Sequence, residues 1–191
     1  MKREVGNRGW PIWLLGDSNP RRWQRVLETP LDPRHPVRHN IWTSVLDTIQ
    51  DRVYRAFRGR LETSSIYIRN AIADPADKPA GTSVTWGAPV AVEVEAFQEL
   101  VDEYQPTMVL SFGAFAFEFA RRALIEKPMR AYSYWGARRL GDEFRARTRR
   151  LGELHDPRHV YASSTVACGH GIRSPTEPHE SGRAPDRPLR Q

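Results

Sequence analysis

The order of apolar and polar segments constrains the fold of this chain more than any other feature of its sequence. Short apolar segments with strand character alternate with segments in which apolar residues recur at helical spacing. The predicted strands are 12–15, 65–69, 108–112 and 160–167, and the predicted helices are 40–57, 92–101, 113–124 and 138–150. Strands that alternate with helices form a parallel sheet covered on both faces. We therefore predict an α/β fold of three layers, α/β/α, around a central four-stranded, mainly parallel sheet.

The last part of the chain differs in composition from the rest. Residues 175–191 contain almost no apolar side chains, so they cannot bury enough surface to order themselves. We expect one α/β domain over residues 1–174 and a flexible tail over 175–191. No segment is long and apolar enough for a membrane span, and residues 1–8 do not have the pattern of a signal peptide. We expect a cytoplasmic monomer without a membrane partner.

The basic side chains of the chain are almost all arginines. The formal net charge is +6, and of the 29 basic residues only Lys2, Lys78 and Lys127 are lysines. Arginine binds phosphate through paired hydrogen bonds, so this composition suits a polyanion such as DNA, although an arginine-rich genome would produce it equally well. A single cysteine, Cys168, excludes an internal disulfide and a cysteine-built metal site. Histidines and carboxylates show no ligand spacing either, so we expect no metal and no other cofactor.

Three predicted strands end in loops with side chains capable of chemistry, and the carboxyl ends of parallel strands meet at one edge of a sheet. In the first loop, Gly16-Asp17-Ser18-Asn19-Pro20, the carboxylate or the amide can position a water, and the same residues also suit an ordinary turn. Asn70 ends the second strand, where its amide can bond the edge of a heterocycle or cap a turn. His170 follows the last strand and can donate a hydrogen bond to a leaving group, with His155 as its competitor.

The order of these motifs resembles that of the uracil-DNA glycosylase superfamily over residues 10–175. The resemblance is carried by Leu14-Leu15-Gly16-x-x-Asn19-Pro20, by Asn70 after a strand, by the segment 106–114 that enters a helix, and by the late His170 loop. It implies that Asn19 positions the attacking water, that Asn70 reads a flipped pyrimidine and that His170 stabilises the departing base. The chain has one more residue between Gly16 and Asn19 than the family motif, which leaves Asp17 as a rival, and no proline follows His170.

The resemblance further implies a monofunctional DNA glycosylase, a hydrolase that extrudes a nucleotide from DNA and cleaves its glycosidic bond to leave an abasic site. Arg173, with Ser174 beside it, is the candidate for filling the gap in the DNA. Trp23 or Phe112 would stack on the base, and core packing is the alternative role for both. The expected substrate-binding set also includes two residues of the first loop. The full set is Gly16, Ser18, Arg21, Arg22, Trp23, Asn70 and Phe112.

The excised base is predicted from Arg21 and Arg22, which follow Pro20. Uracil-specific members of the superfamily place a tyrosine there that blocks groups on C5 of the pyrimidine. Two arginines suit a polar C5 substituent, so we favour hydroxymethylcytosine or its glucosylated form in phage DNA. Bacterial phage-defence members of the superfamily act on such bases. The same arginines can instead hold phosphate. The alternatives are a repair glycosylase for uracil or a damaged base, a non-catalytic DNA-binding module, and an unrelated nucleotide-binding protein, which would lack the usual glycine-rich signatures.

Overall fold

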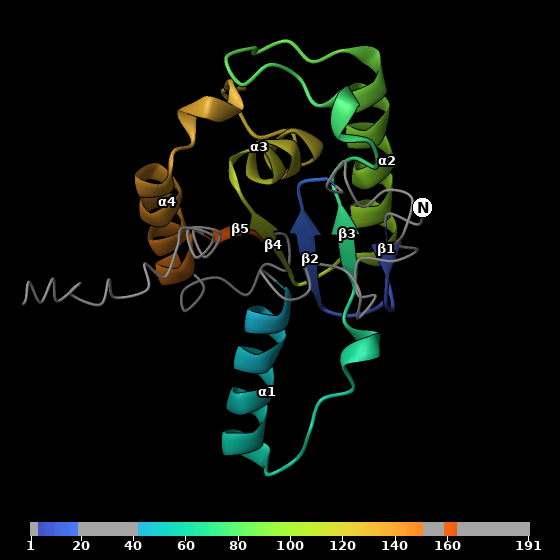
Figure 1. The fold of residues 1–191 in the computed structure, drawn as a ribbon, viewed down its shortest axis with the longest axis vertical. Coiled ribbons are helices and arrows are strands. Elements are labelled where there is room, and N and C mark those ends of the chain that lie inside the picture. The colour runs from blue at the N-terminus through green and yellow to red at the C-terminus, as the bar shows by residue number, and fades with distance from the viewer. Residues whose placement is uncertain (1–3, 19–41, 151–158, 164–191) are drawn as a thin grey trace, which may run out of the picture.

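The structure is a computed structural model that describes residues 4–18, 42–150 and 159–163 (Figure 1). Its strands are β1 (Glu4–Val5), β2 (Ile12–Gly16), β3 (Ile68–Asn70), β4 (Met108–Phe112) and β5 (His159–Ser163). Its α-helices are α1 (Thr43–Phe57), α2 (Ala88–Tyr104), α3 (Ala114–Ala123) and α4 (Ala137–Arg150), and its 3-10 turns are η3 (Thr63–Ser65), η4 (Pro75–Asp77) and η5 (Tyr132–Tyr134).

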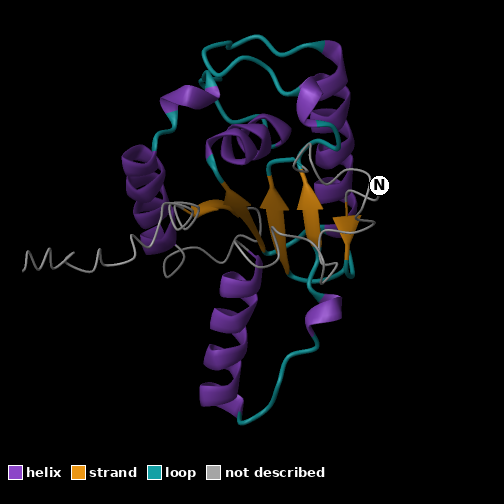
Figure 2. Cartoon of the chain, viewed as in Figure 1, coloured by secondary structure: helices purple, strands orange, loops and turns teal. Residues whose placement is uncertain are grey.

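The strands form one sheet in the order β1-β3-β2-β4-β5 (Figure 2). Strands β3, β2, β4 and β5 are parallel, which confirms the predicted four-stranded parallel sheet. The short strand β1 adds an antiparallel fifth strand beside β3. A strand of two residues is too short to show an alternating pattern, so β1 is not predictable from the sequence.

The two faces of the sheet are covered by different helices, as a layered α/β arrangement requires. Trp13 and Leu15 of β2 belong to a core cluster with residues of α2 and α3, whereas Leu14 belongs to a second cluster with Leu46 of α1. The middle strand is therefore buried on both faces, which explains why its sequence is a continuous apolar run and does not alternate. Helix α1 begins against the sheet and then extends away from the other elements (Figure 1).

Several predicted boundaries differ from the structure. Helix α2, Ala88–Tyr104, extends beyond the predicted range 92–101 at both ends. The second strand begins at Ile68 and not at Ser65, because residues 63–65 form η3. The Glu62 side chain accepts a hydrogen bond from the backbone N–H of Ser64 at 3.0 Å, which stabilises that turn. Strand β5 begins at His159, and the rest of the predicted segment, 164–167, lies outside the described residues, as does the start predicted for the first helix. No described helix has the length and apolar character needed to cross a membrane.

The strand order contains a topological switch point at β2. Along the chain β3 follows β2 on one side, and β4 then lies on the other side of β2. Helices on the two sides of such a point leave in opposite directions, which opens a crevice at the carboxyl ends of the strands. At this edge Gly113, with φ of +99°, turns the chain from β4 into α3, a conformation that favours glycine. The topology therefore places a candidate site after Gly16 and Phe112.

Candidate functional site

Gly16 and Asn70 lie side by side at the carboxyl ends of β2 and β3. They are register partners, and Asn70 is buried. A Cβ atom on residue 16 would collide with Oδ1 of Asn70 and would lie 3.2 Å from Cζ2 of Trp42. Glycine is therefore needed at position 16 for a steric reason, because its bare backbone lets the Asn70 amide lie across the end of β2.

Two buried aromatic rings lie on the same side of the sheet as Asn70. Phe112, at the end of β4, packs edge-on against Trp42 with ring centroids 5.0 Å apart. Both rings belong to the core cluster on the α1 side. The structure thus brings together three residues predicted from the sequence, Gly16, Asn70 and Phe112, and adds Trp42. Sequence reasoning missed Trp42 because it stands outside every motif, directly before α1.

Asp17 continues β2 and its carboxylate turns toward the α3 side of the sheet. One carboxylate oxygen, Oδ2, accepts a hydrogen bond from Nζ of Lys78 at 2.5 Å. The other, Oδ1, is buried and has no hydrogen-bond partner among the described residues. The backbone is held in place because the N–H of Ile72 donates to the Asp17 carbonyl at 3.2 Å. Asp17 therefore has one oxygen in an ion pair and one buried oxygen whose capacity to accept a hydrogen bond is unused among the described residues.

Lys78 reaches this carboxylate from the loop that follows η4. Its ammonium nitrogen lies 5.1 Å from the ring centroid of Phe115 in α3 and 5.2 Å from that of Tyr132 in η5. These cation–π contacts and the ion pair fix the position of the ammonium group. The sequence does not predict this role, because Lys78 stands 61 residues from Asp17 in a proline-rich connection. The one available signal is that lysine is rare in this chain.

A buried carboxylate under η5 holds this side of the site together. Glu118 is fully buried, and its oxygens accept hydrogen bonds from Arg121 at 2.8 Å and from Nε1 of Trp135 at 2.7 Å. They also accept from the backbone N–H of Arg130 at 2.8 Å. A buried charge is tolerated when it is paired and hydrogen-bonded in this way. Glu118 therefore fixes the segment around η5, including Tyr132, on α3.

The remaining predicted site residues fall at or beyond the limits of the described chain. Ser18 is the last described residue of the first loop and is partly buried. The predictions for the others are neither supported nor opposed by the structure, because these residues lie outside the described part: Asn19, Arg21, Arg22, Trp23, His155, His170, Arg173 and Ser174. The expected tail over 175–191 also lies outside it.

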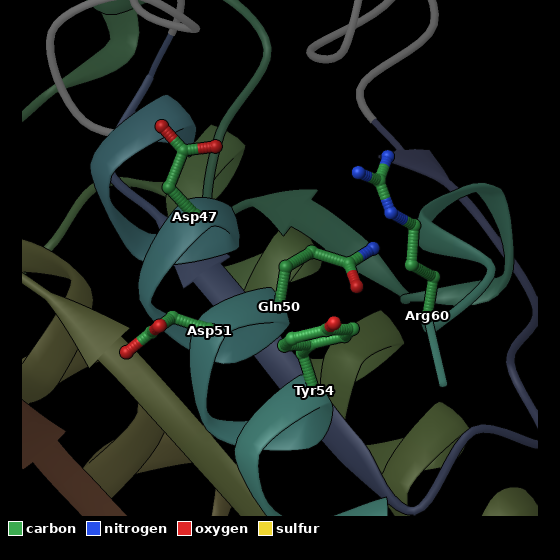
Figure 3. Close-up of a pocket in the computed structure, with 5 residues that line it drawn as sticks. All are labelled: Asp47, Gln50, Asp51, Tyr54 and Arg60. Atoms are coloured by element: carbon green, nitrogen blue, oxygen red, sulfur yellow. The ribbon is translucent and has the colours of Figure 1, made fainter. Parts of the chain in front are cut away.

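Two of the pockets lined by described residues lie away from the strand ends. The larger, of about 450 Å³, lies beside the outer part of α1 and is lined by Asp47, Gln50, Asp51, Tyr54 and Arg60 (Figure 3). The Gln50 amide there already bonds both backbone groups of Leu61, at 2.5 and 2.9 Å. The second pocket, of about 280 Å³, lies between the ends of α2 and α3. Neither pocket contains a residue predicted for the site, and the described residues contain no group of three or more histidine, cysteine or carboxylate side chains placed to hold a metal.

Comparison with models of known protein families and with curated proteins finds no match for this chain. Its function is therefore argued from the geometry at the carboxyl ends of β2 and β3.

Proposed function

We propose that the chain is a DNA glycosylase that flips a modified pyrimidine out of DNA and hydrolyses its N-glycosidic bond. The observation that carries the proposal is the placement of Asn70 and Asp17 at one edge of the sheet, with their side chains on opposite sides of it. Displacement at the sugar C1′ needs the attacking water and the departing base on opposite faces of the sugar. An amide for the base and a carboxylate for the water, separated by the end of β2, suit this requirement.

Asn70 is the group proposed to read the base. A side-chain amide offers both a donor and an acceptor, which matches the edge of a pyrimidine. The neighbouring rings of Trp42 and Phe112 supply an aromatic surface beside the amide. Extrusion of a nucleotide costs a few kcal/mol, which contacts to the flipped base must offset. Because both rings are buried in the unbound protein, stacking on the base requires the Trp42 side of this cluster to open.

Asp17 is proposed to orient the water through Oδ1, which has no hydrogen-bond partner among the described residues. Because this oxygen is buried in the unbound protein, the site must open for the water to reach it. The water oxygen forms a bond to C1′ while the bond between C1′ and the base nitrogen breaks, and the electron pair leaves with the base. A proton of the water passes to the carboxylate. The alternative is that Asn19 positions the water, as the family resemblance implies. His170 would donate a hydrogen bond to the departing base, where negative charge develops.

Lys78 is proposed as a positioning residue for this step. Its ammonium group holds Oδ2 of Asp17, so the carboxylate cannot rotate freely and Oδ1 keeps a single direction. Correct orientation of a reacting group accounts for a large part of catalysis, and a small misplacement is costly. Lys78 itself does not contact the reacting atoms in this mechanism.

The proposed substrate is cytosine that carries a hydroxymethyl group or a glucosyl-hydroxymethyl group, which Arg21 and Arg22 would bind. Replacing both arginines with alanine should then reduce excision of the modified base far more than binding to unmodified DNA, since each lost charge-assisted bond costs roughly 1.5 to 3 kcal/mol. If all DNAs weaken together, the two arginines hold phosphate and the base assignment is wrong.

The experiment that tests the function compares DNAs that contain cytosine, hydroxymethylcytosine, glucosylated hydroxymethylcytosine or uracil. Each is incubated with the protein, and abasic sites are counted. We expect abasic sites only in modified DNA, and we expect Asn70→Ala to abolish them while DNA affinity stays nearly unchanged, because phosphate contacts supply most of that affinity. Release of uracil alone would establish the repair alternative. DNA binding without release of any base would leave a non-catalytic binding module.

A further inference from the structure

The arginines of the described chain fall into two groups. Seven of them form ion pairs with carboxylates: Arg8, Arg55, Arg69, Arg121, Arg122, Arg145 and Arg147. Within the described residues, no carboxylate pairs with Arg130, which precedes α4, or with Arg138 and Arg139, which stand in the first turn of α4. The structure thus pairs seven of its described arginines with carboxylates and leaves others, this group among them, with their charge available.

Two of these arginines are held over a single aromatic ring. The guanidinium carbons of Arg139 and Arg130 lie 4.0 and 4.5 Å from the ring centroid of Tyr134. The same ring contacts the edge of Trp135, with centroids 4.9 Å apart. Because the Tyr134 ring is already engaged by these neighbours, the N–H edges of the arginines are what this surface offers to a ligand.

The arrangement is tied to the core and does not depend on mobile side chains alone. Buried Glu118 accepts a hydrogen bond from the backbone N–H of Arg130 and another from Nε1 of Trp135. The guanidinium of Arg139 donates to the Tyr134 carbonyl at 3.0 Å. Side chains fixed in advance lose less entropy when a ligand binds, so this surface is preorganised.

The charges in this region repel one another in the unbound protein. Arg138 and Arg139 also stand in the first turn of α4, which contains no acidic residue, although the positive end of a helix disfavours cations. An anion placed against the guanidinium groups would relieve this repulsion. The paired N–H donors of an arginine can bond two oxygens of one phosphate group at the same time. A phosphate group is therefore the anion that suits these guanidinium groups.

We propose that Arg130, Tyr134 and Arg139, here called the Arg–Tyr surface, bind the phosphodiester backbone of DNA. The choice of DNA rests on the proposed function. The surface is connected to the candidate site through η5, since Tyr132 contacts Lys78 and Tyr134, at the other end of the same turn, contacts the two arginines. The surface therefore holds the backbone beside the flipped nucleotide, and it does so without regard to base sequence.

The test is the salt dependence of binding to a short labelled duplex of unmodified DNA, measured by fluorescence anisotropy. The double variant Arg130→Gln/Arg139→Gln should bind roughly tenfold or more weakly, and the slope of log affinity against log salt should become shallower by about two, one for each lost phosphate contact. Tyr134→Phe, which keeps the ring, should bind like the parent protein. Tyr134→Leu, which removes it, should bind more weakly.

The matched control is Arg52→Gln/Arg58→Gln. These two arginines also lack a carboxylate partner among the described residues, and Arg58 lies over the ring of Tyr54 at 5.8 Å. They belong to the far end of α1, at the opposite end of the molecule from the turn between α3 and α4 (Figure 1). The control removes the same net charge, but from a part of the molecule that the proposal keeps out of contact with DNA. Its salt slope should therefore equal that of the parent.

Equal losses in the two double variants would overturn the proposal, because binding would then follow net charge and not this surface. An unchanged slope in Arg130→Gln/Arg139→Gln would overturn it as well, provided that circular dichroism shows a folded protein. The outcome is separate from that of the proposed function, because unmodified DNA contains no base to excise. If the protein releases modified bases but Arg130→Gln/Arg139→Gln has the salt slope of the parent, the proposed function stands and the proposed DNA-binding role of the Arg–Tyr surface is wrong.

Discussion

Lys78 shows at the scale of a single residue how the site could depend on a side chain that does not react. If its ion pair orients Asp17, then Lys78→Met should slow the chemical step by up to about 10², the loss typical of a small misplacement, with little change in DNA affinity. Lys78→Arg should restore part of the rate, because it restores a cation. Single-turnover rates measured across pH separate this role from a purely structural one, which would lower the amount of folded protein and leave the rate per folded molecule intact.

Asp17→Ala and Asn19→Ala, measured on the same substrate, decide which residue positions the water. Replacing the residue that has this role should lower the rate of base excision by a factor of at least about 10². A large effect at Asp17 would support the water-positioning role of Oδ1. A large effect at Asn19 alone would return the role to the position implied by the family motif.

Gly16 gives a prediction about stability. In Gly16→Ala the new methyl group would collide with Asn70 and press on Trp42, so we expect a loss of about 1 to 3 kcal/mol in the free energy of unfolding. The matched control is Gly136→Ala, where an added Cβ has no atom within 4 Å and the change should stay within about 0.5 kcal/mol. Urea unfolding measures both. Equal stability of the two variants would mean that the ends of β2 and β3 can move apart easily.

At the scale of elements, the parts that were predictable are those whose apolar pattern is decided locally. The strand at Met108–Phe112 has the predicted bounds, and α3 and α4 begin and end within a residue of the prediction. Turn η5 and the position of Lys78 were not predictable, because they depend on contacts between segments far apart in the chain, such as Ser133 with Gly81. The same holds for the site, in which Gly16 and Asn70 came from motifs and Trp42 came only from packing.

The attachment of α4 depends on a carboxylate between two arginines. Burial alone would raise the pKa of Glu126, but the hydrogen bonds and charges of Arg147 and Arg121 outweigh it and hold this pKa below its usual value of 4.5. A carboxyl group whose pKa is lowered on folding stabilises the folded state above its usual pKa and loses that effect as pH falls through the lowered value. We therefore expect the free energy of unfolding to decrease below about pH 4.5.

Glu126→Gln tests this origin, because glutamine does not titrate. The variant should be less stable than the parent at neutral pH and should lose less stability on acidification. Glu99→Gln, which changes an exposed glutamate of α2, serves as the control and should follow the parent curve. Urea midpoints at several pH values give the comparison, and parallel curves for Glu126→Gln and the parent would assign the acid sensitivity to other groups.

At the scale of the whole molecule, the alternation of strands and helices was enough to predict the mixed α/β architecture and its parallel sheet. Which arginines keep an unpaired charge in the folded protein was not predictable. A count of arginines cannot show which of them face carboxylates, and in the folded chain Arg121, Arg122 and Arg147 are neutralised while Arg130 and Arg139 are not. Net charge is a property of composition, whereas the available charge is a property of the fold.

The two-residue strand β1 has a consequence for the behaviour of the protein in concentrated solution. All residues of strand β3 are buried, and β1 covers its outer edge, where Glu4 also accepts a hydrogen bond from the Tyr67 hydroxyl at 2.7 Å. An uncovered edge of this kind is a template for strands of other molecules. Removal of residues 1–9 should therefore cause self-association that increases with protein concentration, measurable by light scattering. Glu4→Gln, which keeps the strand, should scatter light as the parent protein does. If the truncated protein stays monodisperse, the edge of β3 does not need β1 to prevent self-association. If it aggregates, β1 prevents strands of other molecules from pairing with β3.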